Sequence, residues 1–527
     1  MKSLFFGLVL SLMSFSAMAE KSFVYCSEAS PSTFNPQLGA DGPTFNATSS
    51  TVYNRLAEFK VGSTEIIPGL AESWTISKDG LTYTFKLRKN VKFHSSKGFK
   101  PSRDFNADDV LFSFNRMRDP KHPYHKVSGG KYQYFEGMEM GAIIKDMVKV
   151  DDYTVKFVLS RVEAPFLANI AMDFASILSA EYGEQMMKAK TPEKVDTNPV
   201  GTGPFVFGSY QKDNIIRYTA NPTYWNGKPA IDKLVFAITP DASVRAQKLK
   251  AGECHLIAEP NPADVPALKK AANIDVQEGE GLNVGYLAFN VTRKPFDNIL
   301  VRKAINHALN RSTYIDKIYM GNAVVAINPI PPTMWGYNKA VKNSDYNVQK
   351  AKELLKQAGY PNGFETEMWT LPVSRPYNPQ GKKMGELMQA DLAQVGIKVK
   401  LITYDWPTYL AKSRNGEHQM IQLGWSGDNG DPDNFLNVLL GCSSVEAGSN
   451  VARWCYKPFQ DLIMKGKATA NVGERTKYYQ QAQEIFKEQA PWVTLAHAKS
   501  YRALSKKVHG YKLHPFGTDY FEKITIE

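Results

Sequence analysis

Four cysteines constrain the fold of this chain more than any other feature, because the sequence opens as that of an exported protein. Residues 1–19 combine Lys2, an apolar stretch from Leu4 to Met13, and small residues at Ala17 and Ala19. This pattern predicts a secretory signal peptide cut after Ala19. A membrane anchor is the weaker interpretation, since the apolar stretch is too short to span a bilayer. We therefore expect a soluble, exported protein in an oxidising compartment, where an even number of cysteines favours disulfides.

The four cysteines are Cys26, Cys254, Cys442 and Cys455, and they allow three pairings. Cys442 and Cys455 are close enough in sequence to close a small loop, which leaves Cys26 to pair with Cys254. That second bridge would tie the mature N-terminus to a distant segment, so the N-terminal domain must be built from discontinuous pieces. None of the four has C-x-x-C spacing, so a zinc ribbon or a redox pair is not expected.

Length and charge narrow the class of protein. A chain of 527 residues exceeds one ordinary core, so two or three domains are expected. The segment Ala164 to Ala180 comes nearest to a membrane span, but it contains Asp173 and predicts a buried helix instead. The net charge of +12 is scattered among interleaved acids rather than gathered in a basic stripe, so no nucleic-acid partner is expected.

Hydrophobic patterning predicts a mixed α/β fold. Alternation over Tyr83 to Phe93 indicates a half-buried strand, and Asn106 to Met117 shows helical spacing behind an Asn N-cap. This first third has no regular βαβ order, which favours an α+β region. Further along, the helix predicted over Asp297 to Asn310 is followed by alternating strands and helices, the order typical of a mixed or parallel sheet.

Two charged residues follow the ends of strand-like runs in this later part. Asp428 comes three residues after the run Met420 to Trp425, and Arg375 comes just after another such run. Ligands of open α/β sheets bind beyond the carboxyl ends of strands, so an acid and a base would meet at one site. Alternatively, Asp428 caps the next helix, although Asp431 and Asp433, beside a proline, suit that role better.

The same segments contain aromatic residues but no recognisable catalytic or metal motif. Tyr377 and Trp425 flank the two charges and are the best candidates to wall a pocket. A calcium loop starting at Asp428 would need Gly at its sixth place and Glu at its twelfth, where Asp433 and Leu439 stand. We therefore expect no metal, no cofactor and no catalytic residues, and an exported peptidase has no positive support.

Several stretches carry a family resemblance that extends over the whole mature chain. They are AESWTISKDGLTYTFKLRKNVKFH, NADDVLFSFNRM, NPVGTGPF, NPTYW, ITPDASVRAQKLKAGECHL, NPIPPTMWGYN, RPYNP and GWSGDNGDPDNF. The chain resembles the periplasmic substrate-binding subunits of ABC importers, in the peptide, nickel and oligopeptide family of extracellular solute-binding proteins. The last two stretches are more particular to the dipeptide-binding branch of that family.

The resemblance implies a two-lobed flytrap with a discontinuous, subdivided first lobe. The implied divisions are a signal peptide over 1–19, lobe Ia over 20–52, 203–281 and 499–527, lobe Ib over 53–202, and lobe II over 282–498. Such a protein closes on its ligand at a hinge and delivers it to an inner-membrane permease and its ATPases. It would be a periplasmic monomer, and a chemoreceptor is a further partner that the sequence leaves open.

The resemblance also assigns roles to residues. Asp428 would pair with the α-ammonium of a dipeptide and Arg375 with its carboxylate, and the contacts would be completed by Trp425, Tyr377, Gly424 and Thr44. The segment GADGPTF around Thr44 departs from the pattern of the dipeptide-binding branch. Relatives carry haem, 5-aminolevulinate, glutathione or a nickel chelate, and these remain alternatives. Haem needs an axial His or Tyr, and the nine histidines do not cluster.

Overall fold

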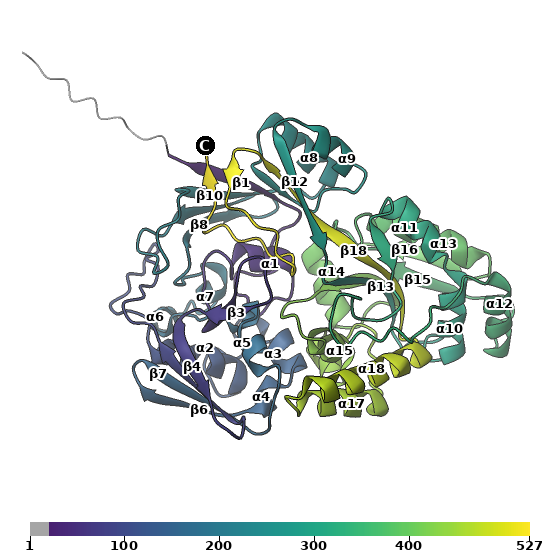
Figure 1. Cartoon of the computed structure of the whole chain (residues 1–527), viewed down its shortest axis with the longest axis horizontal. Helices are drawn as coiled ribbons and strands as arrows, with labels where there is room; N and C mark the ends of the chain where they lie inside the picture. Colours follow the sequence, from purple (N-terminus) through teal and green to yellow (C-terminus); the bar gives the residue numbers. More distant parts are fainter. Residues whose placement is uncertain (1–19) are drawn as a thin grey trace, which may run out of the picture.

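A computed structural model describes residues 20–527, so the predicted signal peptide lies outside the described residues. The chain forms two lobes that share one long sheet (Figure 1). The order of strands in this sheet is β16-β15-β17-β13-β18-β11-β1-β10-β9-β8, and β12 and β14 also pair with β18. Within the described residues, no helix combines the length and apolar character that crossing a membrane requires.

In the first lobe, the N-terminal strand lies between two segments that are distant in sequence. Strand β1 (Ser22–Ser27) runs parallel to both β10 (Lys233–Ile238) and β11 (Leu256–Ala258). The predicted bridge between Cys26 and Cys254 is confirmed, with 5.9 Å between the Cα atoms. The other elements of this part are α1 (Gly42–Ala47), β8 (Phe205–Gln211), β9 (Ile215–Ala220), α8 (Ala242–Ala251), α9 (Val265–Lys270), β12 (Ile274–Glu280), β19 (Val508–His509) and β20 (Thr525–Ile526).

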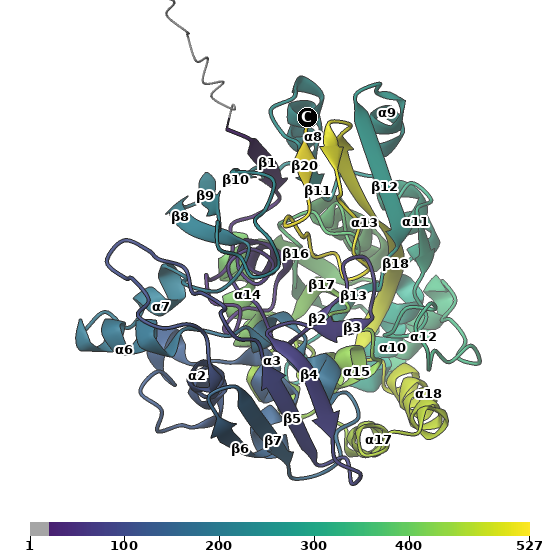
Figure 2. The same ribbon diagram turned by 60° about the vertical axis from the view of Figure 1, so that its left-hand side comes forward.

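A smaller antiparallel sheet with the order β4-β5-β7-β6 forms the subdomain at the bottom of the first lobe (Figure 2). Its core includes Phe85, Phe114 and Phe157, with the Phe114 and Phe157 rings 5.0 Å apart. The elements are β2 (Ala57–Phe59), β3 (Ile66–Pro68), β4 (Ala71–Ile76), β5 (Thr82–Leu87), α2 (Ala107–Arg118), α3 (Gln133–Gly137), α4 (Met140–Ile143), β6 (Ile144–Asp151), β7 (Thr154–Leu159), α5 (Phe166–Ile170), α6 (Ala180–Lys188) and α7 (Lys194–Thr197).

Two predictions for this subdomain have opposite outcomes. The N-cap at Asn106 is confirmed: its side chain accepts from the Asp108 N–H, and Asp109 completes a capping box. The single buried helix over Ala164 to Ala180 is wrong, because α5 ends at Ile170 and only one short 3-10 turn follows. The Asp173 carboxylate accepts from the Ser49 hydroxyl and lies 3.8 Å from the Arg55 guanidinium. Because Ser49 and Arg55 on another segment bind the Asp173 side chain, the chain turns at this point and the helix does not continue.

The second lobe contains the parallel strands that the sequence predicts. Strand β15 (Glu365–Trp369) runs parallel to β16 (Lys398–Ile402) and β17 (Met420–Ser426), so their carboxyl ends lie at one edge. The remaining elements are β13 (Asn283–Phe289), α10 (Ile299–Ala308), α11 (Arg311–Ile318), β14 (Ala323–Val325), α12 (Val348–Gln357), α13 (Gly381–Ala393), α14 (Trp406–Arg414), α15 (Asp433–Leu440), α16 (Ser443–Ala447), α17 (Lys457–Lys467) and α18 (Val472–Gln489). The predicted Cys442–Cys455 bridge is also confirmed, with Cα atoms 4.6 Å apart.

Strand β18 (Trp492–Ser505) connects the lobes, and it is the long yellow strand that crosses between them in Figure 1. Its first half pairs with β13 and β14, and its second half pairs with β11 and β12. The partner changes between Ala498, opposite Ala323, and Lys499, opposite Glu280. The connection from β12 to β13 crosses at the same level. Strand β18 and the β12–β13 connection thus pass between the lobes side by side, as a hinge requires. The residue numbers of the lobe boundaries remain predictions.

Candidate ligand-binding site

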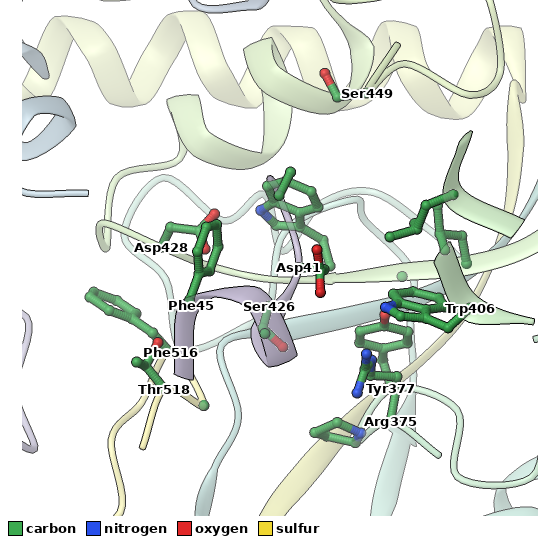
Figure 3. Close-up of a pocket in the computed structure, with 18 of the residues that line it drawn as sticks. Asp41, Phe45, Arg375, Tyr377, Trp406, Ser426, Asp428, Ser449, Phe516 and Thr518 are labelled. Carbon is green, nitrogen blue, oxygen red and sulfur yellow. The ribbon is translucent and has the colours of Figure 1, made fainter. Parts of the chain in front are cut away.

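A cavity of about 110 Å³ lies between the two lobes, and side chains from both enclose it (Figure 3). The carboxyl ends of β15 and β17 supply one side of it, as the strand-end argument predicts. The first lobe contributes Glu28, Asp41, Gly42, Phe45, Tyr134 and Thr518, and the second contributes Arg375, Tyr377, Trp406, Arg414, Trp425 and Asp428.

Arg375 lies in the loop after β15 and is only 7% exposed. Its Nη1 donates to the carboxylate of Glu28, which belongs to the opposite lobe, and its guanidinium stacks 4.7 Å from the Trp406 ring centre. Burial alone would raise the pKa of Glu28, but the charges of Arg375 and Arg245 lower it below its usual value. The buried Nη2 of Arg375 has no acceptor among the described residues. This arginine therefore keeps its charge and a free donor.

Asp428 lies two residues beyond β17 and is half-buried at the cavity. Its Oδ2 accepts from the Tyr134 hydroxyl of the opposite lobe at 2.7 Å and from Asn434 Nδ2 at 3.3 Å. Burial raises the pKa of Asp428 to about 7, an effect that these two hydrogen bonds oppose. No basic side chain pairs with this carboxylate among the described residues. Asp428 is therefore a carboxylate whose charge lacks a counter-ion.

The alternative role of Asp428 as a helix cap is wrong. Among the described residues, the Asp428 side chain accepts no hydrogen bond from a backbone N–H in the first turn of α15. Instead, Asp431 Oδ1 accepts from the Asp433 N–H at 2.9 Å. The N-cap residue of α15 is Pro432, which makes no side-chain capping bond, so this single contact of Asp431 is all that the structure shows of the capping role expected for Asp431 and Asp433.

Tyr377, Trp425 and Gly424 lie together beside these charges. The Tyr377 ring lies directly on Gly424, where a Cβ atom would approach the ring to 2.2 Å. Trp425 is fixed by a 3.0 Å hydrogen bond from its Nε1 to Asn434 Oδ1, the amide that also accepts from the Asp428 N–H. Five of the six predicted contact residues thus line one cavity.

Thr44 is the exception, because its side chain is fully buried behind the cavity wall. Its hydroxyl donates to Asp41 Oδ2 at 2.8 Å, and its N–H donates to Asp41 Oδ1 at 3.1 Å. The neighbouring Asp41, Gly42 and Phe45 face the cavity in its place. A ligand contact for Thr44 remains a prediction.

Several residues of the cavity wall are not predicted by the sequence pattern, including Glu28, Asp41, Tyr134 and Arg414. Glu28 could have been found, since it directly follows the parallel strand β1 and obeys the same strand-end rule as Arg375. Tyr134 had no signal in the sequence, because it reaches Asp428 only through the packing of one lobe against the other.

This fold and site define the class of protein. The model for bacterial extracellular solute-binding proteins, family 5 Middle, matches residues 65–447, and the chain belongs to this family. The two-lobed flytrap expected from the sequence is therefore confirmed.

Three relatives show where the chain stands within the family. It is 53% identical to the dipeptide-binding protein of Escherichia coli, over 99% of this chain and 98% of that protein. It is 49% identical to heme-binding protein A of Haemophilus influenzae, over 97% of this chain and 93% of that protein. The crystal structure of the dipeptide binding protein from Pseudoalteromonas sp. SM9913 in complex with Met-Leu superimposes with a TM-score of 0.94. That pair is 39% identical, and the match covers 96% of this chain and all of the other.

Proposed function

We propose that this protein captures dipeptides in the periplasm by closing its lobes and delivers them to an ABC-type permease of the inner membrane. One observation carries the proposal: within the described part of the chain, the interlobe cavity holds the Asp428 carboxylate without a basic partner and the Arg375 guanidinium with a free donor. Figure 3 shows these two groups on different sides of the cavity. A free dipeptide is a zwitterion whose two ends match them.

The energetics of enclosure favour this ligand class. Closing the lobes on a zwitterion removes two charges from water, at a cost of several kcal/mol per ion unless each is matched. An arginine can hold a carboxylate with two parallel hydrogen bonds, and Asp428 would hold the ammonium. Two extended residues span at most roughly 7 Å, so clamps at both ends would also select for length.

Closure and ligand binding would be coupled through the same two residues. Glu28 contacts Arg375, and Tyr134 contacts Asp428, in both cases from the opposite lobe. Each charged end of the ligand would therefore be bound by a residue of the second lobe, Arg375 or Asp428, that itself contacts the first lobe only when the lobes close. This arrangement suits a hinge-closing carrier that must later release its cargo.

A haem cargo, suggested by the relative from Haemophilus influenzae, fits this cavity less well. No histidine is present among the described lining residues. The Tyr134 hydroxyl already donates to Asp428, but Tyr286 and Tyr377 also line the cavity, so the argument against haem rests on charge. Haem also offers carboxylates but no ammonium to pair with Asp428. Glutathione and 5-aminolevulinate do carry both charges, so the experiment must separate them from dipeptides.

The first test is isothermal titration calorimetry of Ala-Ala with the mature protein and with Asp428→Asn. The substitution should weaken binding by about 2 to 5 kcal/mol, the usual cost of removing one partner of a buried charge pair. Asp275→Asn makes the same chemical change at an exposed position of β12 and serves as the matched control. Unchanged affinity in Asp428→Asn would refute the assigned role.

A second test identifies the cargo directly. Native mass spectrometry of the protein purified from its host, followed by denaturation, should release intact dipeptides of mixed sequence. Release of haem, a metal chelate, glutathione or 5-aminolevulinate alone would contradict the proposal while leaving the two-lobed fold in place.

A further inference from the structure

Arg414 differs from the other arginines that line the ligand cavity. Arg375 is paired with Glu28, and Arg502 pairs with Glu259 at 2.6 Å. Arg414 lines the same cavity, yet it forms no ion pair and donates no side-chain hydrogen bond among the described residues. It is therefore the one cation of the described cavity wall whose charge has no direct partner.

Contacts with the neighbouring segment hold Arg414 in place. It is the last residue of α14, and its carbonyl accepts from Arg453 Nη2 at 3.3 Å. Its side-chain stem packs on Gly448, where a Cβ atom would lie only 2.9 Å from the Cβ of Arg414. Gly448 has a φ of +92°, so a glycine is favoured there on both grounds. The close packing holds the stem of the arginine against the cavity wall.

Asp41, the acid whose charge acts on Arg414, does not neutralise it. Burial lowers the pKa of Arg414, and the charge of Asp41 only partly opposes this effect. The carboxylate of Asp41 is occupied by the N–H and hydroxyl of Thr44 and by the Ser32 hydroxyl, which donates at 2.6 Å. A half-buried guanidinium in this environment favours an incoming anion.

We propose that Arg414 forms a side-chain subsite that favours dipeptides with an acidic residue, Asp or Glu. This inference rests on the proposed function, in which Asp428 and Arg375 hold the two ends of the ligand. The carboxylate at Arg414 must then come from a ligand side chain. Ser449, from the segment that packs near Arg414, lies on a different side of the cavity from Arg375 in Figure 3. A guanidinium binds a carboxylate with charge-assisted, bidentate hydrogen bonds that a neutral amide cannot match.

The test compares isosteric ligands by calorimetry. The mature protein is titrated with Ala-Glu against Ala-Gln, with Glu-Ala against Gln-Ala, and with Ala-Ala as the neutral reference. In at least one pair the glutamate ligand should bind about tenfold more tightly than its glutamine isostere. Equal affinities within both pairs would overturn the subsite without involving any variant, whereas failure of Ala-Ala and all other dipeptides to bind would overturn the proposed function itself.

Two variants of α14 then assign the preference to a residue. Arg414→Gln should reduce the ratio of glutamate to glutamine affinity to about one. Lys412→Gln removes the same charge from the same helix, but Lys412 pairs with Glu417 outside the cavity, so the ratio should persist. A ratio that survives in Arg414→Gln, or that falls equally in both variants, would contradict a direct contact with Arg414.

Discussion

At the scale of single residues, Asp428 lowers the folding stability of the ligand-free protein at neutral and high pH. Its usual pKa near 3.8 is raised to about 7, because removing the carboxylate from water disfavours its charged form and no basic side chain among the described residues pairs with it. Between these values the unfolded chain releases its proton while the folded chain retains it. The folded state therefore loses stability as the pH rises from about 4 to 7, and the loss is complete above pH 7.

Replacing Asp428 by Asn should therefore stabilise the ligand-free protein at high pH. We expect the free energy of unfolding at pH 8 to rise by about 1 to 2 kcal/mol, a figure discounted for the partial exposure of the side chain. At pH 4 the gain should disappear, since the carboxyl is then neutral in the folded protein. Urea unfolding of both proteins at the two pH values measures this difference. A gain of equal size at both would show that ionisation is not its cause.

At the scale of elements, two glycines on neighbouring strands make room for the binding loop. Gly285 of β13 pairs with Gly424 of β17, and the segment containing Tyr377 lies across both. A Cβ atom at Gly285 would lie 2.2 Å from the Tyr377 carbonyl oxygen, and one at Gly424 would lie 2.2 Å from its ring. The close approach also positions Arg375, two residues away.

Gly424→Ala should therefore disturb the site through the loop. Overpacking of this kind usually costs about 1 to 3 kcal/mol of stability. Because displacing the Tyr377 ring shifts Arg375, we expect the binding free energy of a dipeptide to weaken by an amount of the same order. In Gly141→Ala, the new Cβ would meet only Phe135, at an ordinary 3.5 Å, and affinity should not change. Calorimetry on the two variants makes the comparison. If Gly424→Ala bound dipeptides as tightly as Gly141→Ala, the loop that contains Tyr377 would tolerate the extra methyl group and the prediction would be wrong.

The local hydrophobic pattern predicted most helices and strands correctly, but it wrongly predicted one continuous helix over Ala164 to Ala180. The helix expected over Asp297 to Asn310 appears as α10, because its apolar stripe and its Asn298 N-cap act within the segment itself. The strand expected over Tyr83 to Phe93 forms only as far as Leu87. Arg375 and Asp428 were found because strand ends are local features. Tyr134 and Arg414 were missed because tertiary packing alone brings them to the cavity.

At the scale of the whole molecule, the two disulfides act on different parts of the flytrap. The Cys26–Cys254 bridge spans 228 residues and fixes β1 inside the discontinuous first lobe. The Cys442–Cys455 bridge spans only 13 residues, but its loop contains Gly448, which packs on Arg414 at the cavity wall. In the chain-entropy view, the longer loop restricts the unfolded state more strongly.

Removing the two bridges one at a time should therefore have different effects: one removal should mainly lower stability, and the other should mainly weaken dipeptide binding. Cys26→Ala with Cys254→Ala should lower the free energy of unfolding by about 2 to 5 kcal/mol, because the large loop is released, yet leave dipeptide affinity unchanged. Cys442→Ala with Cys455→Ala should cost less stability but weaken binding, because the cavity wall loses its tether. Urea unfolding and calorimetry on both double variants measure the two effects. An unchanged free energy of unfolding in the Cys26→Ala, Cys254→Ala variant would contradict this prediction. It would show that strand pairing alone holds the discontinuous first lobe together.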